Sequence, residues 1–385
     1  MPDTALRLRI FNAGRIREMT RLATQHEAIN LAQGFPDFDP PAELVAAAHA
    51  SLDQGFHQYA QSWGSPRMRE ALAKKQERFM GLPLDPDLHI TVTCGATEAM
   101  MASIKAICNP GDKVIVFSPF YENYKAIIHL NGAQPLYVQL HRPDFTFDPQ
   151  ELRTAFQRGA RALILCNPSN PSGHVFTPAE LQIIADLAQE YDAWVVTDEV
   201  YEHIVYPPNR HTYVSSIPDM FEQTIACGSL SKTYSITGWR LGYIIADEQP
   251  TAQVRKVHDF LTNGAPAPFQ EAAACALALP ASYYTQLTTE YEQRRTIFTS
   301  YLDELGLPYS MPEGTYFCLV DISDCGFAGD VEFCNWLIEE IGVAAVPGSV
   351  FFDHQVTNFA RFHFSKREAT LHQAGERLLG VRQRV

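Results

Sequence analysis

The sequence lacks several features that would identify common classes of protein. Its 385 residues contain eight cysteines, scattered singly and with no CxxC pair, which argues against zinc ribbons and thioredoxin-like redox sites. No apolar run is long enough to span a bilayer, and the charged start "MPDTALRLRIFNAGRIREM" lacks the apolar core of a secretory signal. Free thiols of this kind favour a reducing, cytoplasmic location.

Runs of basic residues are also missing. The formal net charge at pH 7 is −14, and the chain contains no run of Lys and Arg. Because sequence-independent binding to nucleic acid needs such clusters, we expect neither a nucleic-acid partner nor, without a spanning segment, a membrane partner. No GxGxxG motif occurs, which disfavours a nicotinamide enzyme. No metal site is expected.

What the chain does contain is typical of a packed enzyme of two domains, with 46% hydrophobic and 19% charged residues. Short apolar runs recur: "HITVTCGA", "KVIVFSPF", "RALILCNPSN", "AWVVTDEV", "TIACGSLSK" and "LGYIIA". Runs that are apolar on both faces indicate buried parallel strands. Helical patterns alternate with them, such as "TPAELQIIADLAQEYD", where Thr177, Pro178 and Glu180 predict a capping box. Alternation of this kind predicts an open α/β sheet.

The pattern changes at about residue 282. The run "YYTQLTTEYEQRRTIFTSYLDEL" predicts one long helix, followed by the shorter strands "TYFCLVDI", "VAAVPGS" and "ARFHFS" and by a last helix, "EATLHQAGERLLG". These elements indicate a smaller α+β domain at 282–385.

Polar residues gather where the predicted strands end, which is the edge at which open α/β sheets bind ligands. Gly95, Ala96 and Thr97 open a helix after the first strand and would present backbone N–H groups to an anion. The later strands are followed by further polar and aromatic residues: Phe120 and Tyr121, then Asn167 and Asn170, then Asp198 and Tyr201, and last Ser229, Ser231, Lys232 and Arg240.

Each of these residues has an ordinary structural explanation when taken alone. An Asn-Pro pair commonly forms a turn, Asp198 is able to cap a helix, and a lysine at a strand end is commonly solvated. Together, however, they match a phosphorylated, planar, cationic heterocycle that is covalently bound. A lysine forms a Schiff base with an aldehyde, and a carboxylate keeps a pyridine nitrogen protonated. Hydroxyls with an arginine bind a phosphate. We therefore predict pyridoxal 5′-phosphate on Lys232.

At this point the chain resembles the fold-type I, class I pyridoxal-phosphate aminotransferases over nearly its whole length. Four motifs carry the resemblance in the family's order: "NPSNPSG", "TDEVYEHIVY", "SLSKTYSITGWRLGY" and "NFARFHFS". The segments "LAQGFPDFDPP" and "HQYAQSWGSPRMREAL" are most similar to the kynurenine, glutamine and methionine aminotransferase branch. The resemblance implies a large domain with a mostly parallel seven-stranded sheet at 41–281. It also implies that residues 1–40 form an arm and part of the small domain.

The resemblance also implies roles for individual residues around the cofactor. Asp198 would pair with the pyridine nitrogen, while Asn170 and Tyr201 would hydrogen-bond the ring's phenolic oxygen. Tyr121 corresponds to the aromatic residue that stacks on the ring, with its neighbour Phe120 as the alternative. Together with Lys232, Asp198 and Tyr201 form the predicted catalytic set.

The phosphate and the substrate have their own predicted residues. The phosphate would be bound by Gly95, Ala96 and Thr97 with Ser229, Ser231 and Arg240, and by Tyr59 in "HQYA", which the family supplies from the partner subunit of a homodimer. Arg361 would bind the substrate α-carboxylate, with Asn170 and the backbone of Gly34 beside it.

The side-chain pocket is expected to be neutral. No second arginine stands where the aspartate branch binds a distal carboxylate, since the segment reads "LTNGAPAPFQ" with Asn263 and Gly264; Arg15 is the candidate if one exists. We therefore expect transfer of an amino group from an amino acid with an uncharged side chain, such as methionine, glutamine, an aromatic amino acid or kynurenine, to a 2-oxo acid. The alternatives are a cysteine-conjugate carbon–sulfur β-lyase on the same fold and a non-catalytic cofactor-binding module.

Overall fold

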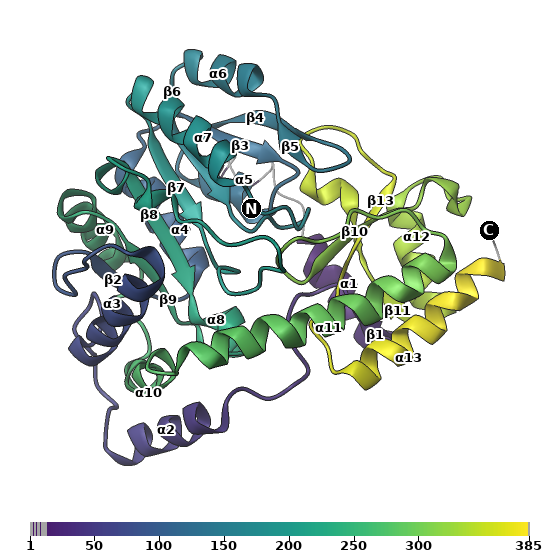
Figure 1. Ribbon diagram of the computed structural model, residues 1–385, viewed down its shortest axis with the longest axis horizontal. Coiled ribbons are helices and arrows are strands. Elements are labelled where there is room, and N and C mark those ends of the chain that lie inside the picture. The colour runs from purple at the N-terminus through teal and green to yellow at the C-terminus, as the bar shows by residue number, and fades with distance from the viewer. Residues whose placement is uncertain (1–2, 4, 6–7, 9–13, 384–385) are drawn as a thin grey trace.

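A computed structural model describes residues 3, 5, 8 and 14–383 (Figure 1). Its helices are α1 (Arg15–Gln25), α2 (Ala42–Asp53), α3 (Pro66–Met80), α4 (Ala96–Ile107), α5 (Asn123–Leu130), α6 (Pro149–Gln157), α7 (Pro178–Glu190), α8 (Leu230–Thr233), α9 (Glu248–Leu261), α10 (Ala267–Leu277), α11 (Ala281–Leu305), α12 (Asp330–Trp336) and α13 (Glu368–Leu378). Its strands are β1 (Ile29–Asn30), β2 (Ile90–Thr93), β3 (Lys113–Ser118), β4 (Gln134–His141), β5 (Thr146–Phe147), β6 (Ala160–Cys166), β7 (Trp194–Asp198), β8 (Thr224–Ser229), β9 (Gly242–Ile245), β10 (Phe317–Asp321), β11 (Val343–Ala344), β12 (Val346–Pro347) and β13 (Phe359–His363).

The large sheet has the order β2-β9-β8-β7-β6-β3-β4-β5. Strands β8, β7, β6, β3 and β4 pair in parallel, and β9 runs antiparallel between β2 and β8. This confirms the mostly parallel seven-stranded sheet, to which the two-residue β5 adds an antiparallel edge. The six strands expected from the apolar runs are all present, whereas β4 was not expected, because its side chains alternate between buried and half-buried.

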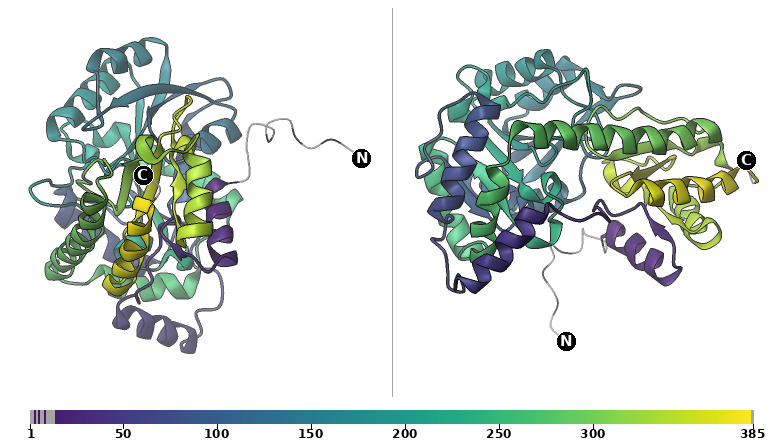
Figure 2. Two further views of the ribbon diagram at one scale, coloured as in Figure 1. Left: turned by 90° about the vertical axis from the view of Figure 1, so that its right-hand side faces the viewer. Right: turned by 60° about the horizontal axis from the view of Figure 1, so that its bottom comes forward.

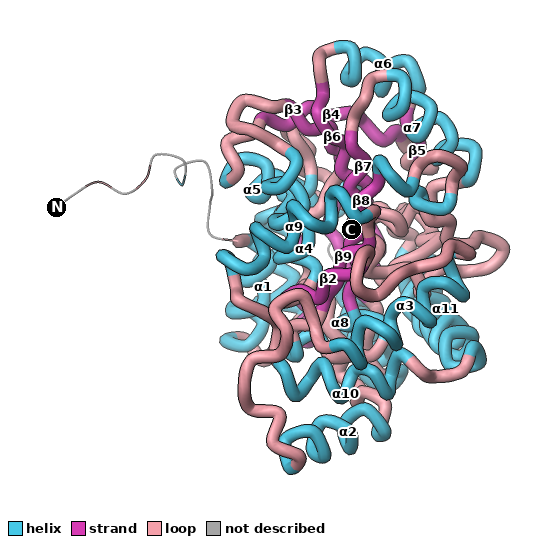
Figure 3. The backbone as a smooth tube through the Cα atoms, turned by 90° about the vertical axis from the view of Figure 1, so that its left-hand side faces the viewer, coloured by secondary structure: helices cyan, strands magenta, loops and turns pink. Residues whose placement is uncertain are grey.

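Helices cover both faces of this sheet, as the apolar runs predicted (Figure 3). Alternate residues of β3 show the division: Val114 and Val116 pack with α4, α5 and α9, while Ile115 and Phe117 pack with α6 and α7 on the other face. Helices α3 and α10 cover the β2–β9 end of that second face. Burial on both faces places polar ligands at the strand ends, where backbone and side chains reach the surface.

The start of α7 confirms the predicted capping box. The Thr177 hydroxyl accepts from the backbone N–H of Glu180, and the Glu180 carboxylate accepts from the backbone N–H of Thr177. Pairs of this kind contribute about 1 kcal/mol to a helix. The helix therefore begins at a residue fixed by local sequence.

The C-terminal part of the chain forms a second, smaller α+β unit around β10, β13 and β12 (Figure 2). The long helix α11 runs from the large unit into it (Figure 1), and α1 contacts β11 and β12. β1 pairs in parallel with β11, and Met19, Leu31 and Phe298 share one buried cluster. These contacts agree with an N-terminal segment that joins the C-terminal unit. We propose the boundaries 1–40, 41–281 and 282–385 for the arm, the large domain and the small domain.

Candidate active site

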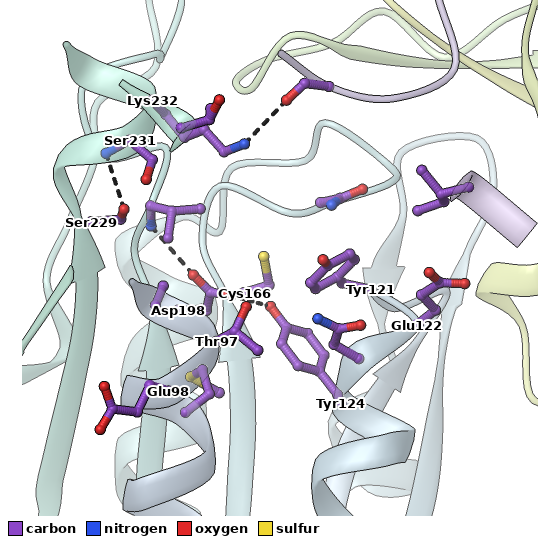
Figure 4. A pocket seen from close by; sticks show the side chains of 18 of the residues that line it. Thr97, Glu98, Tyr121, Glu122, Tyr124, Cys166, Asp198, Ser229, Ser231 and Lys232 are labelled. Atoms are coloured by element: carbon purple, nitrogen blue, oxygen red, sulfur yellow. Dashed lines mark hydrogen bonds between the residues drawn. The ribbon is translucent and has the colours of Figure 1, made fainter. Parts of the chain in front are cut away.

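A cavity of about 890 Å³ lies at the carboxyl ends of the large sheet's strands (Figure 4). Its wall comes from both units: the strand ends and the start of α4 on one side, and α1, β10 and β13 on the other. Most of the residues predicted from the sequence line it: Gly34, Ala96, Thr97, Tyr121, Asn170, Asp198, Tyr201, Ser229, Ser231, Lys232, Arg240 and Arg361. Segments far apart in sequence are thus brought to one place.

Lys232 lies on α8, directly after β8. Its Nζ donates a hydrogen bond of 3.1 Å to the carbonyl oxygen of Gly34. Burial lowers the pKa of Lys232 to about 8, and the positive charge of Arg240 acts in the same direction, while Asp198 opposes it. An amine with this pKa is partly neutral near physiological pH, so it is available as a nucleophile and as a base.

Asp198 ends β7, beside Cys166 of β6 and Cys227 of β8. Its Oδ2 accepts a hydrogen bond of 2.7 Å from the hydroxyl of Tyr124. Burial raises the pKa of Asp198, and the Tyr124 hydrogen bond partly offsets that rise. A buried carboxylate of this kind is best stabilised by a cationic partner, and a protonated ring nitrogen is one.

Of the two candidate stacking residues, Tyr121 lines the cavity and Phe120 does not. The Phe120 ring turns away and stacks on Tyr137, with ring centroids 5.3 Å apart. Tyr121 points into the cavity between Lys232 and the start of α5 (Figure 4). This placement favours Tyr121 for the stacking role.

Arg361 crosses the cavity from β13 and is 1% exposed. Its Nη1 donates to Oδ1 of Asn170 at 2.8 Å, and its Nη2 donates to the carbonyl oxygen of Ala32 at 3.0 Å. The guanidinium also lies over the Phe317 ring, 4.0 Å from the centroid. Its Nε has no hydrogen-bond partner within the described part of the chain. Burial lowers the pKa of Arg361 to about 10, so a carboxylate ligand would relieve a buried charge.

Tyr201 and Gly34 occupy the same side of the cavity as Arg361. The Tyr201 ring packs edge-on against Tyr316 at 5.3 Å and Phe317 at 5.9 Å, and burial raises its pKa well above the usual range. A side chain at Gly34 would collide with Phe317, whose Cζ would lie 2.6 Å from the added Cβ. Glycine is therefore needed here to let the backbone carbonyl approach Lys232.

The N-terminus of α4 forms a cradle for an anion. Gly95 has φ +82°, and Arg240 lies over it, donating to the carbonyl oxygen of Cys94 at 3.4 Å. A Cβ at Gly242 of β9 would lie 2.6 Å from the backbone nitrogen of Ala96, so this glycine lets β9 pass close beneath the cradle. The first N–H groups of a helix lack acceptors within it and attract anions.

Two serines complete this cradle. Ser229 Oγ accepts from the backbone N–H of Ser231 and donates to the carbonyl oxygen of Leu241. Ser231 is 4% exposed, and its Oγ has no partner among the described residues. A buried hydroxyl without a partner costs free energy unless a ligand satisfies it. With Arg240 and the helix N-terminus, this donor fits the phosphate of the predicted cofactor.

Several predicted residues do not line the cavity. Tyr59 lies between α2 and α3 and is 84% exposed. The Asn167 amide is used structurally: its oxygen accepts from the backbone N–H of Phe176 and its nitrogen donates to the carbonyl oxygen of Thr212. Arg15 pairs with Glu18 at 2.7 Å. Asn263 and Gly264 also lie outside the lining, although Leu261 and Thr262, which precede them, do line the cavity.

Other residues that line the cavity were not predicted from the sequence. Tyr124 bonds to Asp198, and Arg17 replaces Arg15 at the cavity wall. Glu98, in the first turn of α4, accepts a hydrogen bond of 2.9 Å from Thr262 and faces buried His258 at 2.6 Å, which ties the end of α9 to the cradle. The helical spacing from Tyr121 to Tyr124 was the available signal for the first of these; the others depend on tertiary packing.

Comparison with known proteins places the chain in one family. Residues 26–378 match the model of the "Aminotransferase class I and II" family. A methionine aminotransferase from Escherichia coli K12 is 42% identical over 365 residues, covering 94% of each chain. Human kynurenine–oxoglutarate transaminase 1 is 33% identical over 396 residues, again covering 94% of each.

A solved structure gives the same result. The N-succinyldiaminopimelate aminotransferase of Mycobacterium tuberculosis superposes with a TM-score of 0.96 at 36% identity, covering 98% of this chain and all of the other. The fold-type I architecture predicted from the motifs is therefore confirmed.

Proposed function

The chain belongs to the class I and II aminotransferases, and from this premise we propose its preferred substrates and the work of its residues. As a member of that family it is a pyridoxal-5′-phosphate-dependent enzyme that moves an amino group between an amino acid and a 2-oxo acid. The amino donors that we propose have uncharged side chains: methionine, glutamine, the aromatic amino acids and kynurenine.

The positions of the arginines that line the cavity are the main support for this proposal. Three arginines line it among the described residues, namely Arg17, Arg240 and Arg361. Arg240 lies over the phosphate cradle and Arg361 is the residue for the α-carboxylate, while Arg17 is exposed at the wall. A distal carboxylate would thus find no buried arginine, and burying a carboxylate without a partner costs far more than burying a thioether or an aromatic ring.

The names of some relatives support the same substrate class, although another relative is an N-succinyldiaminopimelate aminotransferase. The supporting names include methionine aminotransferase and kynurenine–oxoglutarate transaminases. Apolar side chains also contribute to the cavity, among them Ile16, Phe35 and Phe317. A side chain that is apolar over much of its length is therefore favoured.

When bound, pyridoxal 5′-phosphate supplies an electron sink for negative charge at the substrate Cα. Lys232 would act at that carbon as general base, taking the proton on Nζ, and as the acid that gives the proton up again. Its pKa of about 8 suits this exchange. Arg361 and Asn170 would orient the α-carboxylate so that the Cα–H bond faces Lys232, and Asp198 would favour a positive charge on the ring nitrogen.

The remaining predicted residues bind the cofactor. The backbone N–H groups of Ala96 and Thr97, next to Gly95, take the phosphate with Ser229, Ser231 and Arg240. Tyr121 would stack on the ring, and the hydroxyl of Tyr201 would donate to its phenolic oxygen.

A homodimer would complete the site. Tyr59 is 84% exposed, and Phe56 and Leu52 in the same segment are 38% and 43% exposed. Aromatic and aliphatic side chains exposed together mark protein interfaces. We propose that a second copy of this chain covers this segment and that Tyr59 reaches the phosphate of the partner's site.

The free cysteines are consistent with a reducing compartment. All eight are free, and no helix in the described part of the chain is long and apolar enough to cross a membrane. We propose the cytoplasm as the location.

Half-reaction spectroscopy tests the proposed substrates. The cofactor absorbance of the purified enzyme is followed after mixing with methionine, glutamine, phenylalanine, kynurenine or aspartate. We expect each uncharged donor to exceed aspartate at least tenfold in the apparent second-order rate constant. A preference for aspartate would refute the neutral pocket, and formation of pyruvate and ammonia from a cysteine conjugate, with little transamination of any donor, would favour the β-lyase.

A further inference from the structure

Glu122 is an unexpected carboxylate in the wall of the cavity. It lies between Tyr121 and the start of α5 and lines the cavity together with Ile16 and Arg17 of α1. Figure 4 places Glu122 across the cavity from Lys232, with Tyr121 between them. Because Lys232 acts at the substrate Cα, the far wall is where a substrate side chain would end.

The three carboxylates that line the cavity in the described residues differ in their partners. Asp198 accepts from Tyr124 and from the backbone N–H of Val200. Glu98 accepts from Thr262 and from a backbone N–H. Glu122 has no side-chain hydrogen bond or ion pair with any residue that the structure describes, although it is half-buried. Its acceptor oxygens are therefore available to a ligand.

Two arginines on different elements influence the pKa of Glu122. Burial raises its pKa, and the positive charges of Arg361 on β13 and Arg17 on α1 act against that rise. Neither arginine forms an ion pair with it. An added Cβ at Gly14, just before α1, would lie 3.6 Å from Oε1 of Glu122, so the start of α1 packs closely against this carboxylate.

Arg17 is the complementary group on the wall. It lines the cavity, and its guanidinium has no side-chain partner among the described residues, whereas the neighbouring Arg15 is occupied by Glu18. The wall thus presents a hydrogen-bond acceptor at Glu122 and a donor at Arg17. A neutral group that carries an N–H donor beside a carbonyl oxygen, such as a carboxamide or an amino-substituted aryl ketone, matches both.

We propose that Glu122 and Arg17 together determine the side-chain specificity of this enzyme, with Glu122 accepting the N–H of a neutral amide-like side chain and repelling a carboxylate. The proposal rests on the uncharged-donor function above and adds to it a preference within that class. In this proposal Arg17 does not suffice to admit glutamate, because a distal carboxylate near Arg17 would lie near Glu122 as well. Specificity of this kind combines an attractive with a repulsive element.

The test compares three donors of similar length: glutamine, glutamate and methionine. Glutamine offers the amide, glutamate the charge and methionine neither. We expect Glu122→Gln to lower the glutamine-to-methionine ratio of kcat/KM about tenfold and to raise the glutamate-to-methionine ratio about tenfold, since an amide oxygen accepts a weaker hydrogen bond than a carboxylate oxygen and the like charge is removed. Glu122→Asp keeps the charge and should keep the exclusion of glutamate.

Arg17→Gln should also lower the glutamine-to-methionine ratio, by about fivefold, without raising that of glutamate. Glu18→Gln is the matched control for Glu122→Gln, because it removes a negative charge from α1, outside the cavity. Both ratios should stay within twofold of wild type. Cofactor absorbance and melting temperature verify that each variant is folded and loaded.

The two proposals fail in different ways. If wild type transaminates methionine but Glu122→Gln leaves both ratios unchanged, Glu122 does not determine specificity and the proposed function stands. If the ratios change equally in Glu122→Gln and Glu18→Gln, the change comes from the net charge of the protein and not from Glu122 in particular, and the inference is wrong. If wild type prefers aspartate to every uncharged donor, the proposed function itself is wrong.

Discussion

The guanidinium of Arg361 is hydrogen-bonded to the side chain of Asn170, Nη1 to Oδ1, at 2.8 Å. This bond joins β13 to the loop after β6, so it connects the two units of the chain across the cavity. The second bond of Arg361, to the carbonyl oxygen of Ala32, adds the N-terminal segment. The arginine is therefore fixed before any carboxylate arrives, which reduces the entropy lost on binding.

Arg361→Lys should lower kcat/KM for every amino donor about 100-fold while leaving the cofactor bound. A lysine keeps one charge but loses the two parallel N–H donors that match a carboxylate. Steady-state kinetics with methionine and phenylalanine measure the loss, and cofactor absorbance measures occupancy. An equal loss for a substrate without an α-carboxylate would show that Arg361 has another role.

Asp198→Ala should lower kcat by about a factor of 100 or more, the size of losing one preorganised electrostatic partner. Tyr124→Phe should have a smaller effect in the same direction, because it removes the hydrogen bond that favours the charged form of Asp198. Single-turnover rates with saturating methionine separate chemistry from binding. Near-normal turnover of Asp198→Ala would contradict its placement beside the ring nitrogen.

His174 should make stability depend on pH. It lies in the loop that carries Asn170, with its ring nitrogens 3.3 Å from Glu180 and 3.1 Å from Glu313. Its pKa is raised from 6.5 to about 9, because these two glutamates outweigh the opposing effect of burial. A raised pKa means that the stabilisation is complete below pH 6.5 and is lost as the pH rises through about 9; the shift corresponds to about 3 kcal/mol.

Melting temperatures of wild type and His174→Gln at pH 6 and pH 9.5 measure this contribution. Wild type should lose about 5 °C more than the variant between the two pH values. Parallel curves for the two proteins would show that His174 carries no linked charge.

Mixed dimers should reveal whether Tyr59 acts across the interface. Tyr59→Ala should weaken cofactor binding about tenfold, the effect of losing one hydrogen bond to a charged group. A dimer of one Lys232→Ala and one Tyr59→Ala subunit would contain one intact site and should recover about half of wild-type activity at limiting cofactor. The control dimer pairs Lys232→Ala with Asp198→Ala and contains no intact site. Activity of the first dimer no higher than that of Tyr59→Ala would place Tyr59 in its own subunit.

The sequence predicted those parts of the molecule that depend on local patterns. Runs buried on both faces predicted six strands of the large sheet, and the capping box of α7 begins where Thr177 placed it. The polar residues after the strands could be grouped because parallel strands end at one edge. The family motifs then gave Arg361, which no local pattern distinguishes.

Other features could not be predicted because they arise from packing between distant segments. Strand β4 was missed because its half-buried alternation resembles a surface segment. Arg15 was named as the candidate in case a second arginine reached the cavity, but the helical turn of α1 directs it to Glu18 and brings Arg17 to the wall. Glu122 is an ordinary acidic residue in the sequence; its significance appears only when α1 packs against it.

Reduction with borohydride followed by peptide mapping tests the central claim most directly. The claim is that Lys232 binds the cofactor covalently and transfers the proton at the substrate Cα. The purified enzyme should be yellow, and reduction should attach the cofactor to the peptide that contains Lys232; Lys232→Ala should still bind the cofactor, without covalent attachment and without transamination. Labelling of another lysine in the wild-type protein would contradict the account.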